Sequence, residues 1–315
     1  MKYIQTFHES DNINDIYLVK QRTSAVTKNG KAYDNVILQD KTGTIDGKIW
    51  DPNSAGIDDF EAMDYVAITG TVKEFNSALQ LSITRARKAR AGEYSEEDYL
   101  PVSGNSVDGM YNELLSYING LENTWLKQLC EEFFVKDEEF IKKFKVSSAA
   151  KSVHHSFVGG LLEHTLSVTR LCEYYTKAYP MLKKDLLISV AILHDIGKVR
   201  ELSAFPENDY TDDGQLLGHI VMGSEMVSEK IKEIDGFPVK LASEIKHCIL
   251  AHHGEYEFGS PKKPALMEAV ALNFADNTDA KLETLTEIFR STTNNGWLGF
   301  NRLLDSNLRK TGELS

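Results

Sequence analysis

The chain has 315 residues, of which 42% are apolar and 26% are charged, and its formal net charge is −12. These ordinary proportions exclude a disordered or low-complexity chain, and the length allows two domains with buried cores. The longest near-continuous apolar stretch, residues 186–193, is too short to cross a bilayer, and the polar start lacks the apolar segment of a signal peptide. We therefore expect a cytoplasmic protein that does not enter a membrane.

The cysteines also support a cytoplasmic location. Cys130, Cys172 and Cys248 are odd in number, widely spaced and outside any Cys-x-x-Cys pair. That pattern fits a reducing environment, and it argues against a disulfide framework or a thiolate zinc site. We expect the three thiols to serve packing.

The negative charge is unevenly distributed. Residues 1–92 hold 12 basic and 12 acidic residues, whereas residues 93–315 hold 23 basic and 35 acidic ones. An acidic chain argues at first against a nucleic-acid partner, because binding a polyanion normally needs a basic surface. Cations bound to the acidic part could nevertheless supply the positive charge that phosphates require.

Between residues 15 and 87 the sequence alternates apolar with other residues in five short runs. Turn-forming residues separate the runs at 28–30, 41–43 and 76–77, and a longer connection covers 53–61. Five short strands in fewer than a hundred residues are typical of a small barrel of the OB type. The alternating positions are Ile16, Leu18, Val36, Leu38, Ile45, Gly47, Ile49, Val66, Ile68, Val72, Leu79, Leu81 and Ile83.

One face of this barrel has the residue types that bind nucleic-acid strands. Alternation turns Lys48 and Trp50 outward, and Tyr33 extends the same surface. Bases stack on exposed aromatics for about 1–3 kcal/mol each, while cations follow the phosphates. Arg85 and Arg87 form a basic exit from the barrel. Two alternatives stay open: Trp50 covers a barrel end, and the arginines belong to a solvated linker.

Beyond residue 93 the composition shifts to helix formers. Apolar residues at three-to-four-residue spacing over 108–134 predict one amphipathic helix, within a helical linker at 93–150. Residues 151–315 alternate helical segments with polar loops and show no credible strand. We expect a multidomain α and β chain, with a five-stranded OB-type barrel over 1–92 followed by an all-α bundle.

Histidines and carboxylates gather in the second half. Eight of the nine histidines lie between His154 and His253. Imidazoles with carboxylates and no thiolates favour divalent manganese, iron, cobalt, nickel or zinc, and the set is large enough for two ions, which Asp195 could bridge. The candidate ligands are His164, His194, Asp195, His219, His252, His253 and Asp276.

Each candidate has a plain structural alternative. A histidine beside leucines is more often a hydrogen-bonded core residue, which is our interpretation of His247. Two neighbours on a helix need not both reach a metal, so the role of His252 stays open. We expect His155 to contact substrate and Lys198 to neutralise charge on a phosphate, although Lys198 could simply stabilise a helix C-terminus. Asp279 could orient a ligand.

At these residues the chain resembles the HD superfamily of metal-dependent phosphohydrolases. The resemblance consists of His164, the doublet His194-Asp195 followed by Ile-Gly-Lys, and Asp276, together with the additional histidines of dinuclear members. The stretch KSVHHSFVGGLLEHT behind an OB-like barrel resembles, more specifically, the YhaM family of 3′-to-5′ exoribonucleases. The absence of a Gly-Tyr-Pro signature counts against the cyclic-dinucleotide phosphodiesterases.

This resemblance implies an HD domain over 151–315 that receives single-stranded RNA from the OB-fold domain, usually with manganese. It predicts hydrolysis to nucleoside 5′-monophosphates by a metal-activated water, with single-stranded DNA as a second candidate substrate and a homo-oligomer left open. Two other functions remain: an HD nucleotidase acting on free nucleotides, and a single-strand-binding protein with an inactive HD scaffold.

Overall fold

The computed structural model describes residues 1–27, 29–75, 78–100, 105–151, 155–290, 292, 294, 296–302 and 304–312. It divides into two compact units. One consists of residues 1–102 with 204–207, and the other of residues 103–203 with 208–315. Each is described by itself.

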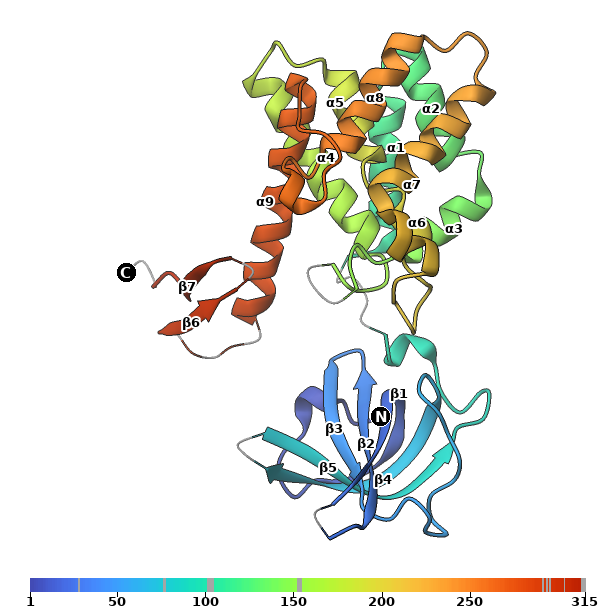
Figure 1. Cartoon of the computed structure of the whole chain (residues 1–315), viewed down its shortest axis with the longest axis vertical. Coiled ribbons are helices and arrows are strands. Elements are labelled where there is room, and N and C mark those ends of the chain that lie inside the picture. Colours follow the sequence, from blue (N-terminus) through green and yellow to red (C-terminus); the bar gives the residue numbers. More distant parts are fainter. Residues whose placement is uncertain are drawn as a thin grey trace. The chain divides into compact units, whose positions relative to one another are not determined.

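The first unit is a closed five-stranded barrel (Figure 1). Its strands are β1 (Asn12–Val26), β2 (Ala32–Asp40), β3 (Gly43–Ile49), β4 (Tyr65–Phe75) and β5 (Ala78–Lys88). They follow the order β1-β2-β3-β5-β4, in which β3 and β5 are parallel and every other pair is antiparallel. The five predicted strands and the OB-type barrel are thereby confirmed. The predicted turns at 28–30 and 76–77 lie partly or wholly outside the described residues.

Alternation along the strands builds the barrel core. Val36 and Leu38 on β2 and Ile45 and Ile49 on β3 are buried, because alternate side chains of a strand point to the same face. Lys48, on the opposite face of β3, is half-buried. The core therefore fixes which side chains the barrel presents outward.

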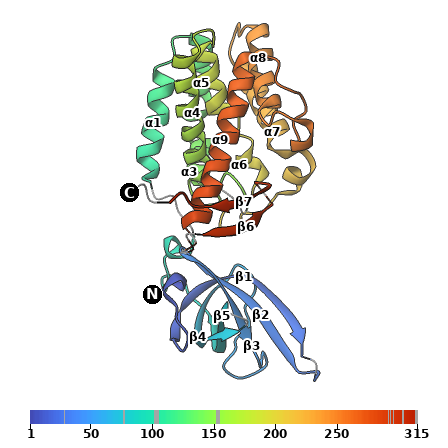
Figure 2. The ribbon, with the colours of Figure 1, turned by 90° about the vertical axis from the view of Figure 1, so that its left-hand side faces the viewer.

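The second unit is mainly helical. Its helices are α1 (Val107–Asn119), α2 (Thr124–Phe134), α3 (Glu138–Val146), α4 (Gly160–Ala178), α5 (Lys184–Leu193), α6 (Lys198–Glu201), α7 (Asp212–Glu233), α8 (Val239–Ala251) and α9 (Met267–Arg290). Helices α4, α5 and α9 lie side by side (Figure 2). Short 3-10 turns lie at Ile4–Thr6, Glu96–Asp98 and Tyr256–Phe258.

The region predicted as a linker differs from the prediction in two ways. Residues 108–134 form two helices, because Asn123 begins a new helix by accepting hydrogen bonds from the backbone N–H groups of Trp125 and Leu126. Helices α1 to α3 also share one apolar core with α4 and α5, which includes Leu114 and Phe133. They are part of the helical unit and not a separate bridge.

The prediction of no strand in the second half is wrong. After α9 the chain forms a two-stranded antiparallel hairpin, β6 (Trp297–Asn301) and β7 (Ser306–Arg309). These strands are too short to show clear period-2 alternation, and a register shift between Trp297 and Gly299 interrupts it further.

Among the described residues, no helix combines the length and apolar character needed to cross a membrane.

Candidate metal centre

Three helices bring the first group of candidate ligands together. His164 lies in the second turn of α4, and Asp276 lies in the middle of α9. The doublet His194-Asp195 follows the last residue of α5, a helix that is buried from Leu186 to Leu193. Neighbouring residues within a helix point about 100° apart. Both members of the doublet reach one site because they stand at the helix end.

The donor atoms of these side chains lie close enough to one another to share a metal ion. His164 Nε2 lies 3.2 Å from Asp276 Oδ1, 3.3 Å from Asp195 Oδ2 and 3.3 Å from His194 Nε2. His164, His194 and Asp276 each offer one ligand atom, and these atoms all lie within 4.8 Å of one another. Two donors that share a metal at about 2.0–2.2 Å stand at comparable separations.

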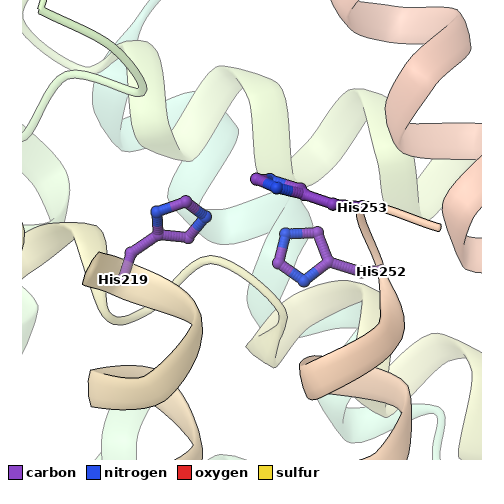
Figure 3. A group of neighbouring side chains, drawn as sticks. All are labelled: His219, His252 and His253. Carbon is purple, nitrogen blue, oxygen red and sulfur yellow. The ribbon is translucent and has the colours of Figure 1, made fainter. Parts of the chain in front are cut away.

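A second group lies on α7 and beyond α8. His219, His252 and His253 form another set whose ligand atoms are mutually within 4.8 Å. Figure 3 shows the three rings close to one another, with His219 on α7 and His252 and His253 just after the end of α8. The ring centroids of His252 and His253 are 4.4 Å apart. The sequence left open whether His252 and His253 can both reach one site. In the structure both rings lie next to His219.

Asp195 stands between the two groups. Its Oδ2 faces His164 and His194, whereas its Oδ1 lies 3.4 Å from His219 Nε2 and 3.6 Å from His252 Nε2. The buried carboxylate has neither oxygen in a hydrogen bond of acceptable geometry, although Lys198 Nζ lies 2.6 Å from Oδ2. A buried carboxylate without hydrogen bonds is costly unless a cation compensates it. The donor set therefore fits divalent cations on both sides of Asp195.

All five candidate histidines present the same ring atom to this site, because each engages Nδ1 elsewhere. The Nδ1 atoms of His194 and His252 lie 2.8 and 2.7 Å from the carbonyl oxygens of Ala191 and Ile249. Nδ1 of His253 lies 2.8 Å from the carbonyl oxygen of Phe258. His164 and His219 use the carboxylates of Asp279 and Glu201 instead. If each Nδ1 carries the proton, each Nε2 lone pair is free for a metal.

Glu201 is a site residue that sequence reasoning missed. Its Oε1 accepts hydrogen bonds from the backbone N–H and from the ring Nδ1 of His219, both at 2.9 Å. Helix α7 is interrupted at Gly218, whose φ of 74° and ψ of 157° are not helical, so His219 opens the second half of the helix. The carboxylate thus caps that half-helix and orients the ring. Glu201 lies six residues after Asp195, and this spacing is not one that marks metal ligands in a sequence.

Asp279 contacts the ring Nδ1 of His164 as Glu201 contacts that of His219. It lies one turn after Asp276 on α9, and its Oδ2 is 2.7 Å from His164 Nδ1 and 3.0 Å from His155 Nε2. His155 is only 2% exposed. The predicted substrate contact by His155 does not fit this placement, because the ring is buried and its Nε2 lies against Asp279. His155 instead fixes Asp279, which in turn orients His164.

Electrostatics follow from the burial and pairing of these groups. Burial alone would lower the pKa of His164, but the adjacent carboxylates of Asp195, Asp276 and Asp279 outweigh it and raise that pKa well above the usual value. Burial opposes ionisation of Asp195, yet nearby Lys198 and His194 hold its pKa well below the usual range. Burial lowers the pKa of His253 to about 4, so its ring is neutral at pH 7.

The remaining predictions for the helical unit have mixed outcomes. Lys198 lies at the site, with its ammonium group beside Asp195. His247 accepts a hydrogen bond from the backbone N–H of Ala265 through Nε2, which agrees with a structural role. His154 lies outside the described residues.

Of the barrel residues predicted to bind nucleic acid, Trp50 and Arg85 are exposed, whereas Tyr33 and Lys48 are half-buried. Tyr33 and Trp50 stack with ring centroids 5.4 Å apart and an interplanar angle of 28°, and Trp50 is 47% exposed. The Lys48 ammonium lies 5.6 Å from the centre of the Tyr33 ring. Arg85 is exposed, whereas Arg87 is held by Glu93 through two hydrogen bonds of 2.8 and 3.0 Å. The surface is thus two stacked aromatics beside a cation.

Comparisons with known proteins agree with this architecture. A family model described as HD domain matches residues 161–281, a range that contains all seven candidate ligands. The second OB-fold domain of replication protein A from Methanococcus maripaludis is 20% identical, covering 30% of this chain and 96% of that one, with a TM-score of 0.23. At that level it adds nothing to the strand order described above.

Two relatives resemble nearly the whole chain, and each is named 3′-5′ exoribonuclease YhaM. The relative from Bacillus velezensis is 34% identical over 285 residues, which are 89% of this chain and 88% of that protein. The relative from Geobacillus is 34% identical over 273 residues, which are 86% and 83%. With barrel, HD domain and ligand set in one chain, this protein belongs to the YhaM family.

Proposed function

We propose that this protein is a divalent-metal-dependent 3′-to-5′ exoribonuclease that releases nucleoside 5′-monophosphates from single-stranded RNA. The observation that carries the proposal is the buried carboxylate of Asp195, which faces a histidine group on each side and has neither oxygen in a hydrogen bond of acceptable geometry. The names of the two relatives supply the direction and the substrate class.

The residues of the helical unit have separate roles in this reaction. His164, His194, Asp195 and Asp276 would hold one cation, and Asp195 with His219, His252 and His253 would hold a second. When bound, such cations lower the pKa of water and offset the charge on a phosphate. The ammonium of Lys198 lies beside Asp195 and would neutralise charge developing on the phosphate oxygens.

The metal is proposed to be manganese. Two carboxylates and two imidazoles in the first group are mixed oxygen and nitrogen donors, which suit manganese as well as iron, cobalt, nickel or zinc. The family resemblance favours manganese among them. The three buried, unpaired thiols of Cys130, Cys172 and Cys248 support a cytoplasmic location.

The barrel is proposed to hold the strand, and the helical unit to cut it. Bases would stack on the surface formed by Tyr33 and Trp50, while Lys48 and Arg85 would lie near the backbone phosphates. Arg87 would join them only by leaving Glu93.

A single variant tests the metal centre. Asp195→Asn removes charge from the position shared by the two groups, so we expect hydrolysis of a 5′-labelled single-stranded RNA to fall by more than about a hundredfold. The wild-type protein should shorten the RNA from its 3′ end only when manganese is added. Metal analysis of the purified variant should show reduced metal content, while RNA binding stays close to wild type.

The control is Asp235→Asn, an exposed aspartate in the turn after α7. It should leave activity and metal content unchanged. Retained hydrolysis in Asp195→Asn would refute the proposal. Hydrolysis of free nucleoside triphosphates but not of RNA would point to a nucleotidase, and RNA binding without bound metal would point to an inactive scaffold.

A further inference from the structure

The C-terminal hairpin has one exposed aromatic face. In its register Trp297 pairs with Arg309 and Phe300 pairs with Asn307, so these four side chains lie on the same side of the sheet. Trp297 is 65% exposed and Phe300 is 62% exposed. The register shift between Trp297 and Gly299 is what brings aromatics three residues apart onto one face. We call these four residues the aromatic face.

The opposite side of the hairpin is different. Leu298, Asn301 and Leu308 lie there and are half-buried. An isolated two-stranded sheet is at best marginally stable, and its apolar residues are expected to pack inward. Here the two leucines pack while the larger rings remain in solvent. Large exposed apolar groups on one face indicate a binding surface.

The charge of this segment identifies the kind of ligand. From Arg290 to Ser315 the chain carries four cations, Arg290, Arg302, Arg309 and Lys310, against the two carboxylates of Asp305 and Glu313. The whole chain, by contrast, has a net charge of −12. A local basic segment with exposed rings is complementary to a flexible polyanion with flat bases. A second copy of this acidic chain would match the charge but offers no run of flat bases to stack on the two rings.

We propose that the aromatic face is a second binding site for single-stranded RNA, in which bases stack on Trp297 and Phe300 and Arg309 contacts phosphate. The proposal rests on the function proposed above. The hairpin follows α9, the helix that carries Asp276 and Asp279 (Figure 1). From Asp279 to Arg290 the helix rises by about 16 Å, at 1.5 Å per residue. One short strand can therefore contact both the hairpin and the metal centre.

Fluorescence of Trp297 tests the site directly. The chain has three tryptophans, so Trp50→Phe with Trp125→Phe leaves Trp297 as the only one. In EDTA, which prevents hydrolysis, a single-stranded oligoadenylate should quench this emission in a saturable way, and added salt should weaken the effect. Arg309→Ala in the same background should weaken the binding. Unchanged Trp297 emission, at RNA concentrations that saturate binding measured by anisotropy, would overturn the proposal.

A double variant tests the consequence for catalysis. Trp297→Ala with Phe300→Ala should raise the KM for RNA by at least about tenfold, because each stacked base contributes about 1–3 kcal/mol. Hydrolysis of bis-p-nitrophenyl phosphate, which is too small to span both sites, should stay unchanged. The control is Tyr174→Ala, an equally exposed aromatic on α4 at 65%. Two cations on α4, Arg170 and Lys177, lie near Tyr174 in the sequence. Arg170 is paired with Glu113, and Lys177 is paired with Glu173.

The remaining outcomes are distinct. If the double variant changes the mass of the particle in solution while RNA affinity stays at the wild-type value, the face joins copies of the chain and the proposal fails. If the wild-type protein hydrolyses neither RNA nor the diester, the proposed function fails, whereas quenching of Trp297 by RNA would still establish the binding site.

Discussion

At the residue scale, the imidazole rings depend on acceptors that hold their Nδ1 atoms. Three of the five acceptors are backbone carbonyls, which no substitution removes, and two are carboxylates, Asp279 and Glu201. A histidine ligand held by a carboxylate is a stronger donor and has a fixed ring orientation. Glu201 is the cleaner of the two to vary, because Asp279 also lies against His155.

Replacing Glu201 should weaken metal binding at His219. Glu201→Ala removes the acceptor of Nδ1, so we expect manganese affinity, measured by calorimetry, to fall by about 10–100-fold. Glu201→Gln should recover much of this loss, since its amide oxygen still accepts both hydrogen bonds. At saturating manganese the KM for RNA should not change.

Glu225→Ala is the matched control, since Glu225 is exposed on the same helix α7. It should leave manganese affinity unchanged. Equal metal affinity in Glu201→Ala and the wild-type protein would show that Glu201 serves only the helix.

The residue types of the ligand set could be predicted from sequence, whereas their supports could not. His164, the His194-Asp195 doublet and Asp276 stand out because imidazole and carboxylate side chains are rare within apolar helices. Glu201 resembles any other glutamate in the sequence, since its role depends on the backbone break at Gly218. The burial of His155 depends on packing between α4 and α9. A local sequence pattern contains no information about such packing.

At the element scale, two glycines shape α7 and its contact with the turn after the His194-Asp195 doublet. A Cβ on Gly197 would lie 2.0 Å from the carbonyl oxygen of His219, so the turn after Asp195 can lie against α7 only with glycine there. Gly218 has open space around it, with Glu201 Oε1 at 3.8 Å as the nearest atom to an added Cβ. Its requirement is the backbone conformation alone, which is essentially restricted to glycine.

Gly218→Ala should therefore destabilise the helical unit without a steric clash. We expect the free energy of unfolding, measured with denaturant, to fall by about 1–3 kcal/mol. Gly109→Ala is the control, since Gly109 lies in the first turns of α1, and an added Cβ would find its nearest neighbour at 3.4 Å. That change should be neutral or stabilising by up to about 1 kcal/mol. Equal effects of the two substitutions would contradict a backbone origin.

Elements with long, regular patterns were the predictable ones. The five barrel strands follow from alternation, because each has one buried face. The break at Asn123 was missed because the apolar spacing of α1 continues in register into α2. The hairpin was missed because its strands have five and four residues, which is too short for a period to emerge.

At the scale of the whole molecule, the proposed binding surface of the barrel and the proposed metal centre belong to different units. Trp50→Ala should raise the KM for a long RNA by about 5-fold or more, because one stacking partner is lost. The kcat, and hydrolysis of a small phosphodiester, should stay at wild-type values. Trp50→Phe keeps an aromatic ring and should restore most of the affinity. A fall in kcat in Trp50→Ala would show that the barrel also serves the chemical step.

The ends of α5 and α8 have a further consequence. Both helices stop where the site begins, at Leu193 and Ala251, so their partially negative carbonyl ends converge there together with Asp195 and Asp276. A phosphate arriving at this place first would be repelled, whereas a cation would be attracted. We therefore expect a phosphate to enter this centre only after a cation has bound, although the strand can already lie on the barrel and the hairpin. The ion would then decide when a bound strand is cut, and not whether the strand binds.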